Sequence, residues 1–283
     1  MLDFVDLFSG CGGLSLGLMQ AGIELTSAVE KSEMAAETYH YNLIRNAKIS
    51  WEEFQSLDAS EQVEFGLVLG DVRKVLKDQA TLRKLKKAKV SILVGGPPCQ
   101  GYSISGKRER NDVRNSMSRF FLRFVDELQP QFIIVENVHG MRVSFSGIGL
   151  DNEFSELAWK INSKNYVVQP AELDAAAYGV PQARKRVFLF CVHAGIAPFM
   201  GIEDTGEVLD LHRVVMRNGV IYHSGGGDKK LERYDGRRRQ VPPLIPPPLR
   251  NFRPAGPVLE KIKKTASRSG LKNHNFRKHC QKT

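Results

Sequence analysis

The sequence contains no apolar run that approaches the roughly 20 residues needed for a helix to cross a bilayer. It also lacks the basic segment and apolar core of a secretory signal, because Met1 leads directly into a strand-like stretch at residues 2–8. We therefore expect a cytoplasmic protein with no membrane partner.

Cysteine is scarce, and no two cysteines form a CxxC pair. This spacing argues against a zinc site and against a disulfide framework, so reduced thiols are expected, one of which could be a nucleophile. His274, His279 and Cys280 fit no usual metal-site spacing, and no metal is expected. The four cysteines are Cys11, Cys99, Cys191 and Cys280.

Acidic residues are few toward the end of the chain. The formal net charge is +10, and from Lys229 onward only Glu232, Asp235 and Glu260 oppose a long series of Lys and Arg. A basic surface of this kind fits a polyanionic partner, because each phosphate contact releases condensed counterions. On charge alone, a solvated and solubilising surface explains the same excess equally well.

Short apolar runs alternate with stretches of helical period. We expect strands at 2–8, 24–30, 91–96 and 131–138, and helices at 14–21, 34–43 and 119–128. This alternation predicts a doubly wound α/β fold with a mostly parallel sheet covered on both faces. Segments 170–179 and 186–192 predict two more strands joined by a polar turn, which would add an antiparallel edge and end the sheet near His193.

These patterns divide the chain in two. Residues 1–195 are expected to form the α/β domain, and residues 196–283 a basic, partly irregular segment. Within the second part, the glycines at 225–227 and the prolines at 242–254 predict loops or an extended linker.

A strand, a glycine-rich turn and a helix start follow one another from Asp6 to Gly17. Glycine there lets the backbone approach a ligand, and a helix N-terminus favours a carboxylate. The Lys-Ser/Thr of a P-loop is absent, and a tight structural turn explains the segment alone equally well. Glu30 ends the next strand, where an acid often binds ribose hydroxyls, and Asp71 follows an apolar run where it could accept an adenine amino group. Together these features indicate an adenosyl cofactor.

The glycines and prolines around Cys99 predict a loop there rather than a helix or strand. Pro97 and Pro98 stiffen the approach to it from the apolar strand, which suits a thiol held in one position. Glu136 follows another apolar run and reaches the same edge of the sheet, where a buried carboxylate needs a partner or a role. Arg184 and Arg186 alternate along a predicted strand, so both should point to one face.

In this order, DLFSGCGGLSLG, GGPPCQGYS, ENV and QARKRVF resemble the successive motifs of the cytosine-5 DNA methyltransferase family of the bacterial restriction-modification type. The resemblance implies an S-adenosylmethionine-dependent enzyme whose catalytic domain is residues 1–195. Glu30 would bind the ribose and Asp71 the adenine amino group. The remaining residues implied for the cofactor pocket are Phe8, Gly10, Gly12, Leu14, Val72 and Pro98.

The resemblance also implies the reaction. Cys99 would add to carbon 6 of a flipped-out cytosine, converting the ring to an enamine that attacks the sulfonium methyl. Glu136 would hydrogen-bond to and protonate N3, Arg184 and Arg186 would orient the base, and Asn137 would shape the site. Side chains of the Cys99 loop and the polar segment after it would contact double-stranded DNA: Gln100, Ser103, Lys107, Arg108, Arg110 and Arg114.

The resemblance stops before two features of the family. Neither a complete target-recognition region nor the later helical motif that completes the cofactor pocket is evident, although residues 271–279 resemble the start of a recognition region. We therefore expect a second subunit to supply them, and a truncated fragment or pseudogene product and an atypical minimal enzyme are the alternative explanations. A catalytically silent DNA-binding subunit and an RNA cytosine-5 methyltransferase remain alternative readings of the same residues.

Overall fold

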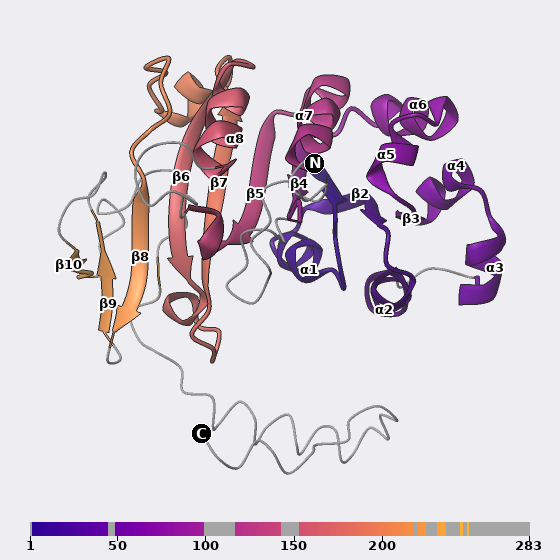
Figure 1. Cartoon of the computed structure of the whole chain (residues 1–283), viewed down its shortest axis with the longest axis horizontal. Helices are drawn as coiled ribbons and strands as arrows, with labels where there is room; N and C mark the ends of the chain where they lie inside the picture. Colours follow the sequence, from indigo (N-terminus) through magenta and orange to yellow (C-terminus); the bar gives the residue numbers. More distant parts are fainter. Residues whose placement is uncertain are drawn as a thin grey trace, which may run out of the picture.

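The computed structural model describes residues 2–44, 49–98, 117–142, 153–217, 220–224, 231–235, 244–245 and 248. Ten strands form one sheet in the order β10-β9-β8-β6-β7-β5-β4-β1-β2-β3, with helices against it (Figure 1). The predicted α/β class is thus confirmed, and the sheet is mostly parallel in its amino-terminal half.

The parallel half contains β1 (Asp3–Leu7), β2 (Glu24–Glu30), β3 (Leu67–Leu69), β4 (Ile92–Gly95) and β5 (Phe132–Val138). β1 lies at its centre and pairs in parallel with both β2 and β4. The strand order therefore reverses beside β1. In open sheets of this type, ligands bind in the crevice outside the carboxyl ends of the strands at such a point.

Helices cover both faces of this half of the sheet. Successive side chains of β1 point to opposite faces, and both faces carry apolar side chains that pack against helices. Phe4 packs with Leu14 and Leu18 of α1 (Gly13–Gln20) on one face. On the other face Val5 belongs to the cluster that includes Phe121 and Phe124 of α7 (Met117–Leu128). The expected helices at 14–21, 34–43 and 119–128 are therefore present, the second as α2 (Glu33–Leu43).

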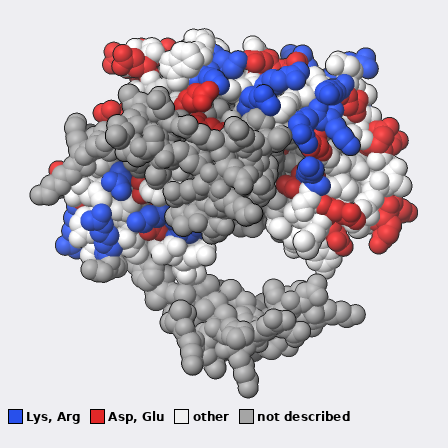
Figure 2. All heavy atoms as spheres, in the orientation of Figure 1, with Lys and Arg blue, Asp and Glu red and all other residues white. Residues whose placement is uncertain are grey.

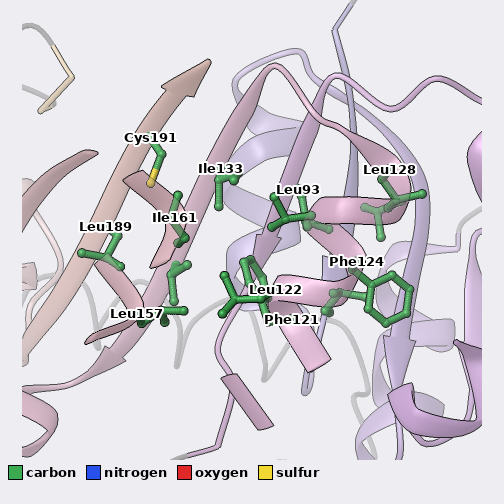
Figure 3. Close-up of a cluster of buried hydrophobic side chains, with 14 of the residues drawn as sticks. Leu93, Phe121, Leu122, Phe124, Leu128, Ile133, Leu157, Ile161, Leu189 and Cys191 are labelled. Carbon is green, nitrogen blue, oxygen red and sulfur yellow. The ribbon is translucent and has the colours of Figure 1, made fainter. Parts of the chain in front are cut away.

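The largest core cluster lies under α7 and α8 (Glu153–Asn162). Phe121 and Phe124 are fully buried, and burying a side chain of this size stabilises the fold by about 1.5–3 kcal/mol. The remaining helices are α3 (Trp51–Ser56), α4 (Ala59–Gln62), α5 (Val72–Val75) and α6 (Gln79–Lys87). Figure 3 shows the cluster's labelled side chains, which include Leu93, Phe121, Leu122, Ile133, Leu157 and Leu189.

The other half of the sheet extends further than the sequence predicted. β7 (Lys185–His193) lies between β5 and β6 (Tyr166–Asp174) and is antiparallel to both. The prediction that the sheet ends near His193 is wrong, because β8 (His212–Arg217) pairs in parallel with β6, and β9 (Val220–His223) and β10 (Glu232–Arg233) follow in antiparallel register. The antiparallel edge is therefore confirmed but longer than expected.

The strand expected at 170–179 is also shifted. β6 begins at Tyr166 and ends at Asp174, and the following alanines form the 3-10 helix η5 (Ala175–Tyr178). Asp174 causes the change because its side chain accepts a hydrogen bond from the backbone N–H of Ala176 and caps that turn. Short 3-10 turns also occur at η1 (Val63–Phe65), η4 (His139–Arg142) and η6 (Ala197–Met200). Within the described residues, no helix is long and apolar enough to cross a membrane.

Two histidines are buried together in the strands that extend the sheet beyond His193. His212 on β8 and His223 on β9 are 0% and 3% exposed, and their ring centroids lie 6.0 Å apart. Among the described residues, none of the four ring nitrogens has a hydrogen-bond partner. Burial, together with the neighbouring His223, lowers the pKa of His212 to about 4. The His212 ring is therefore uncharged in the folded protein at neutral pH.

Replacing His212 with Phe should make the fold less sensitive to acid. In the unfolded chain a histidine has a pKa near 6.5, whereas His212 in the folded chain has a pKa near 4. The free energy of unfolding is therefore highest above pH 6.5, and it decreases as the pH falls from there through the folded pKa. The shift bounds this loss at about 3 kcal/mol. Urea unfolding of both proteins at pH 7.5 and pH 5 measures it. Equal losses in the two proteins would contradict the assignment.

Candidate functional site

A cavity of about 520 Å³ opens at the carboxyl ends of four parallel strands. Phe8 follows β1, Glu30 ends β2, Asp71 follows β3, and Gly96 and Pro98 follow β4. These strands flank the point where the strand order reverses, so the cavity lies where the fold predicts a ligand. Of the residues expected to hold a cofactor, the cavity brings together Phe8, Glu30, Asp71, Val72 and Pro98.

The carboxylate of Glu30 is fixed in the cavity wall by two backbone groups. The N–H of Gly10 donates to Oε2 at 2.8 Å, and the N–H of Ser32 donates to Oε1 at 2.7 Å. Each oxygen retains a further acceptor site, because an ionised carboxylate has about four. Glu30 can thus accept a pair of hydroxyl groups without leaving its position.

Gly10, Gly12 and Leu14 do not line the cavity. Gly12 has φ +87°, and a Cβ atom there would lie 2.3 Å from Cδ1 of Leu43, so the position must stay glycine for α1 to pack against α2. Leu14 packs in the core near Phe4. Gly10 contributes indirectly through Glu30, and cofactor contacts from these three residues stay a prediction.

Asp71 is held by two cations that the sequence reasoning missed. Arg73 donates to Oδ1 from Nε at 2.9 Å and to Oδ2 from Nη2 at 2.6 Å, while Lys31 Nζ lies 3.4 Å from Oδ2. Arg73, followed by Lys31, keeps the pKa of Asp71 well below its ordinary value. The carboxylate is therefore a permanent acceptor that shares its lone pairs with Arg73. The spacing Asp-x-Arg after a strand could have indicated this pair.

A second missed feature lies beneath the glycine-rich turn. Asp6 is 1% exposed, and its Oδ2 accepts the hydroxyl of Ser15 at 2.6 Å, which in turn accepts the hydroxyl of Tyr39 at 2.8 Å. Burial raises the pKa of Asp6 to about 7, against the opposing effect of Ser15. An aspartate inside the apolar strand at residues 3–7 was the available signal for a buried polar network.

Glu136 lies at the end of β5, within reach of the β4 loop. A Cβ atom on Gly96 would lie 3.4 Å from both the carbonyl oxygen and Oε2 of Glu136, so glycine permits this close approach. Arg186 Nε lies 3.0 Å from Glu136 Oε1, because the antiparallel register places Val138 opposite Arg186 and Glu136 opposite Phe188. Burial raises the pKa of Glu136, while Arg186 and then Arg184 act to lower it. The carboxyl thus keeps its proton to a higher pH than usual.

Arg184 and Arg186 act on the same carboxyl from different positions. Arg186 is in β7, whereas Arg184 lies just before that strand, is exposed, and donates its backbone N–H to Asp174 Oδ1 at 3.2 Å. Only Arg186 contacts Glu136 directly. The sequence predicted both arginines at alternating positions of one strand, but only Arg186 of the two is in β7. Both nevertheless act to lower the pKa of Glu136.

Asn137 ties β5 to the segment that precedes Cys99. Its Nδ2 donates to the carbonyl oxygen of Pro97 at 2.8 Å, and its Oδ1 accepts the N–H of Val138 at 2.9 Å. The side chain is 5% exposed, so this amide pair is shielded from water. Asn137 thereby fixes the approach to the loop that the sequence analysis singled out.

Several predicted site residues lie outside the described residues. Of the four cysteines, the structure describes Cys11, which is exposed, and Cys191, which is buried in the core. Burial raises the pKa of the Cys191 thiol, so this residue is a poor nucleophile. The predicted site residues outside the described part of the chain are Cys99, Gln100, Ser103, Lys107, Arg108, Arg110 and Arg114.

Comparison with known proteins gives a consistent result. A family model described as C-5 cytosine-specific DNA methylase matches residues 2–205. The chain is 35% identical over 187 residues to the type II methyltransferase M.DdeI of Desulfomicrobium norvegicum, covering 66% of this chain and 40% of that protein. It is 33% identical over 213 residues to the type II methyltransferase M1.HphI of Haemophilus parahaemolyticus, covering 73% and 47%. The chain thus spans less than half the length of either relative.

A solved structure agrees with the fold. The crystal structure described as a prophage-encoded DNA modification methyltransferase from E. coli superposes with a TM-score of 0.52 at 31% sequence identity. The match covers 69% of this chain and 48% of that protein. The residues that the family model matches, 2–205, include those that line the cavity and Glu136.

Replacing Arg186 with Gln should raise the pKa of Glu136 further, because the nearest opposing cation is lost while burial remains. Carboxyl NMR titration of glutamate-labelled protein, assigned with Glu136→Gln, measures the shift. Arg184→Gln is the matched control and should give a smaller rise. A fall in the pKa of Glu136 in the Arg186 variant would contradict the proposed electrostatics.

Proposed function

Because the chain belongs to the C-5 cytosine-specific DNA methylase family, we propose that it transfers a methyl group from S-adenosylmethionine to carbon 5 of cytosine in DNA. The observation that carries this proposal is the placement of Glu136. Its carboxyl has a raised pKa, contacts Arg186, and lies against Gly96 in the loop that leads to Cys99. An acid positioned in this way can deliver a proton to a ring bound beside that loop.

The cavity suits an adenosyl cofactor in size and in lining. Ligand cavities commonly measure about 300–1,000 Å³, and this one is about 520 Å³. Glu30 would accept the ribose hydroxyls, Asp71 the adenine amino group, and Phe8 with Val72 would provide apolar contacts. When bound, the cofactor supplies an electrophilic sulfonium methyl group. Pro98 lines the same cavity, so a donor bound there would lie next to the residue that precedes Cys99.

The chain's residues would then activate the cytosine. The Cys99 thiolate forms a bond to carbon 6 while Glu136 donates a proton to N3, which leaves carbon 5 nucleophilic. Carbon 5 would then be able to accept the methyl group that a bound cofactor would supply. A base then removes the proton from carbon 5, Glu136 recovers its proton, and elimination releases Cys99. Arg186 would stabilise the glutamate when it is ionised.

We propose that the protein binds double-stranded DNA and that it does so in the cytoplasm. The target base must leave the helix, since carbon 5 and carbon 6 are stacked inside it, at a cost of a few kcal/mol. Arg184, which is exposed beside Glu136, would contact the extruded base or its phosphate. The polar segment after Cys99, with Lys107 and Arg108, would contact the backbone.

We also propose that a further segment completes the enzyme, supplied by the same polypeptide or by a second subunit. The chain spans less than half of its relatives. Phe188 and Phe190 of β7 stack at 5.5 Å and are only partly buried, as is Ile134, which the register places opposite Phe190. A partly exposed apolar sheet surface next to Glu136 is a place for such a segment to pack. It would also carry the choice of target sequence.

The proposed nucleophile can be tested by trapping. Incubated with the complementing segment, S-adenosylmethionine and duplex DNA that contains 5-fluorocytosine, the protein should form a denaturation-resistant adduct, because fluorine blocks the final elimination. Cys99→Ser should form none. Glu136→Gln should form adduct about 100-fold more slowly, as expected for loss of a general acid. Denaturing gel electrophoresis measures the adduct, and an adduct formed by the serine variant would contradict the proposal.

Acceptor choice provides the second arm of this test. Methyl transfer to tRNA in place of duplex DNA would favour the RNA enzyme. Absence of transfer to either acceptor, with the complementing segment present, would favour a silent DNA-binding subunit.

A further inference from the structure

A groove of about 540 Å³ lies between α6 and α7, outside the site described above. Gln79, Arg83 and Lys87 of α6 form one side, and Arg123 of α7 forms the other. The buried side chains of Leu76 and Leu82 lie at its base. We propose that this groove binds the phosphate backbone of nucleic acid at a second location, separate from the active site.

The charge of this region supports the proposal. Residues 72–89 contain eight Lys and Arg against one Asp, a net charge of +7, whereas the whole chain carries +10. Figure 2 shows Lys and Arg side chains gathered over α5, α6 and α7. The basic character of the chain is therefore concentrated here as well as in the carboxy-terminal segment.

Carboxylates neutralise only part of this charge. Lys84 pairs with Glu64, and Lys86 pairs with Glu127 at 2.9 Å. Within the part of the chain that the structure describes, Arg83, Lys87 and Arg123 have no acidic partner. Three cations from two helices thus converge on one groove without compensation, and an anion placed between the helices would relieve their mutual repulsion.

The groove's chemistry favours a phosphodiester over an acidic protein. Guanidinium groups bind phosphate oxygens in a planar, bidentate manner, and a lysine adds a point charge. Gln79 can donate a neutral hydrogen bond of the kind that phosphate and sugar oxygens accept. The one carboxylate at the groove, Glu127, is paired with Lys86 and leaves the other cations available.

The groove and the proposed active site lie toward opposite ends of the parallel strands. α6 ends at Lys87, shortly before β4 begins at Ile92, so the groove lies toward the amino ends of the parallel strands. The cavity and Glu136 lie at the carboxyl ends of these strands. The nucleic acid bound here is therefore a different stretch from the one that presents the target base.

A pair of matched double variants tests the proposal in the full chain. Lys87→Gln with Arg123→Gln removes one groove cation from each helix. Lys160→Gln with Lys164→Gln, in and after α8, removes the same charge elsewhere and is the control. Lys87 and Arg123 are exposed, so the substitutions should leave the fold intact, which thermal unfolding verifies.

The readout is the affinity for a labelled duplex of about 60 base pairs, measured by fluorescence anisotropy over a series of salt concentrations. The groove variant should lose about tenfold in affinity at low salt, and its salt slope should fall by about two, one for each lost phosphate contact. The control should change neither. Adduct formation on a short 5-fluorocytosine duplex should be the same in all three proteins, which separates this proposal from the catalytic one.

Two results would overturn the proposal. Equal losses in the groove and control variants would mean that only net charge matters. Unchanged DNA binding by the groove variant would exclude a nucleic-acid site there, and loss of binding to polyglutamate in that variant would instead assign the groove to an acidic protein.

Discussion

The antiparallel pairing of β5 with β7 is the constraint on which the candidate site depends. It inserts β7 between two mutually parallel strands and sets the register that places Arg186 beside Glu136. A shift of one residue would send Arg186 to the opposite face of the sheet and leave a half-buried carboxyl without its cation. The pKa of Glu136 depends on this register, because burial raises it and the neighbouring Arg186 lowers it.

A second group of interactions joins the loops at the carboxyl ends of the strands. Asn137 connects β5 to Pro97, and Glu30 connects the turn after β1 to the turn after β2. Each link uses a short, buried or half-buried polar side chain and backbone groups. The loops are therefore held to one another as well as to their own strands, which gives the cavity a defined wall.

Much of the parallel half could be predicted from the sequence, because short strand-like segments alternate there with stretches of helical period. The edge beyond His193 could not, since β8 begins with a histidine and ends with an arginine, and its pairing with β6 is non-local. At the site, Glu30, Asp71 and Glu136 were found because each lies near the carboxyl end of a strand. Arg73 and the buried partners of Asp6 were missed because their importance depends on contacts that spacing alone does not specify. The sequence placed Gly12 in the cofactor pocket, which stays a prediction, and it did not show that a Cβ atom there would meet Leu43 and Tyr39 of α2.

The two backbone hydrogen bonds to Glu30 have a consequence for the energetics of ligand capture. Since Gly10 and Ser32 already hold the carboxylate in place, a ligand that meets it immobilises no rotamer at that position. Ordering a flexible side chain at an interface costs about 0.5–1.5 kcal/mol, and this pre-organised acid avoids that penalty. The affinity for a ligand at Glu30 thus depends on the contacts that form and is not reduced by loss of side-chain conformational entropy there.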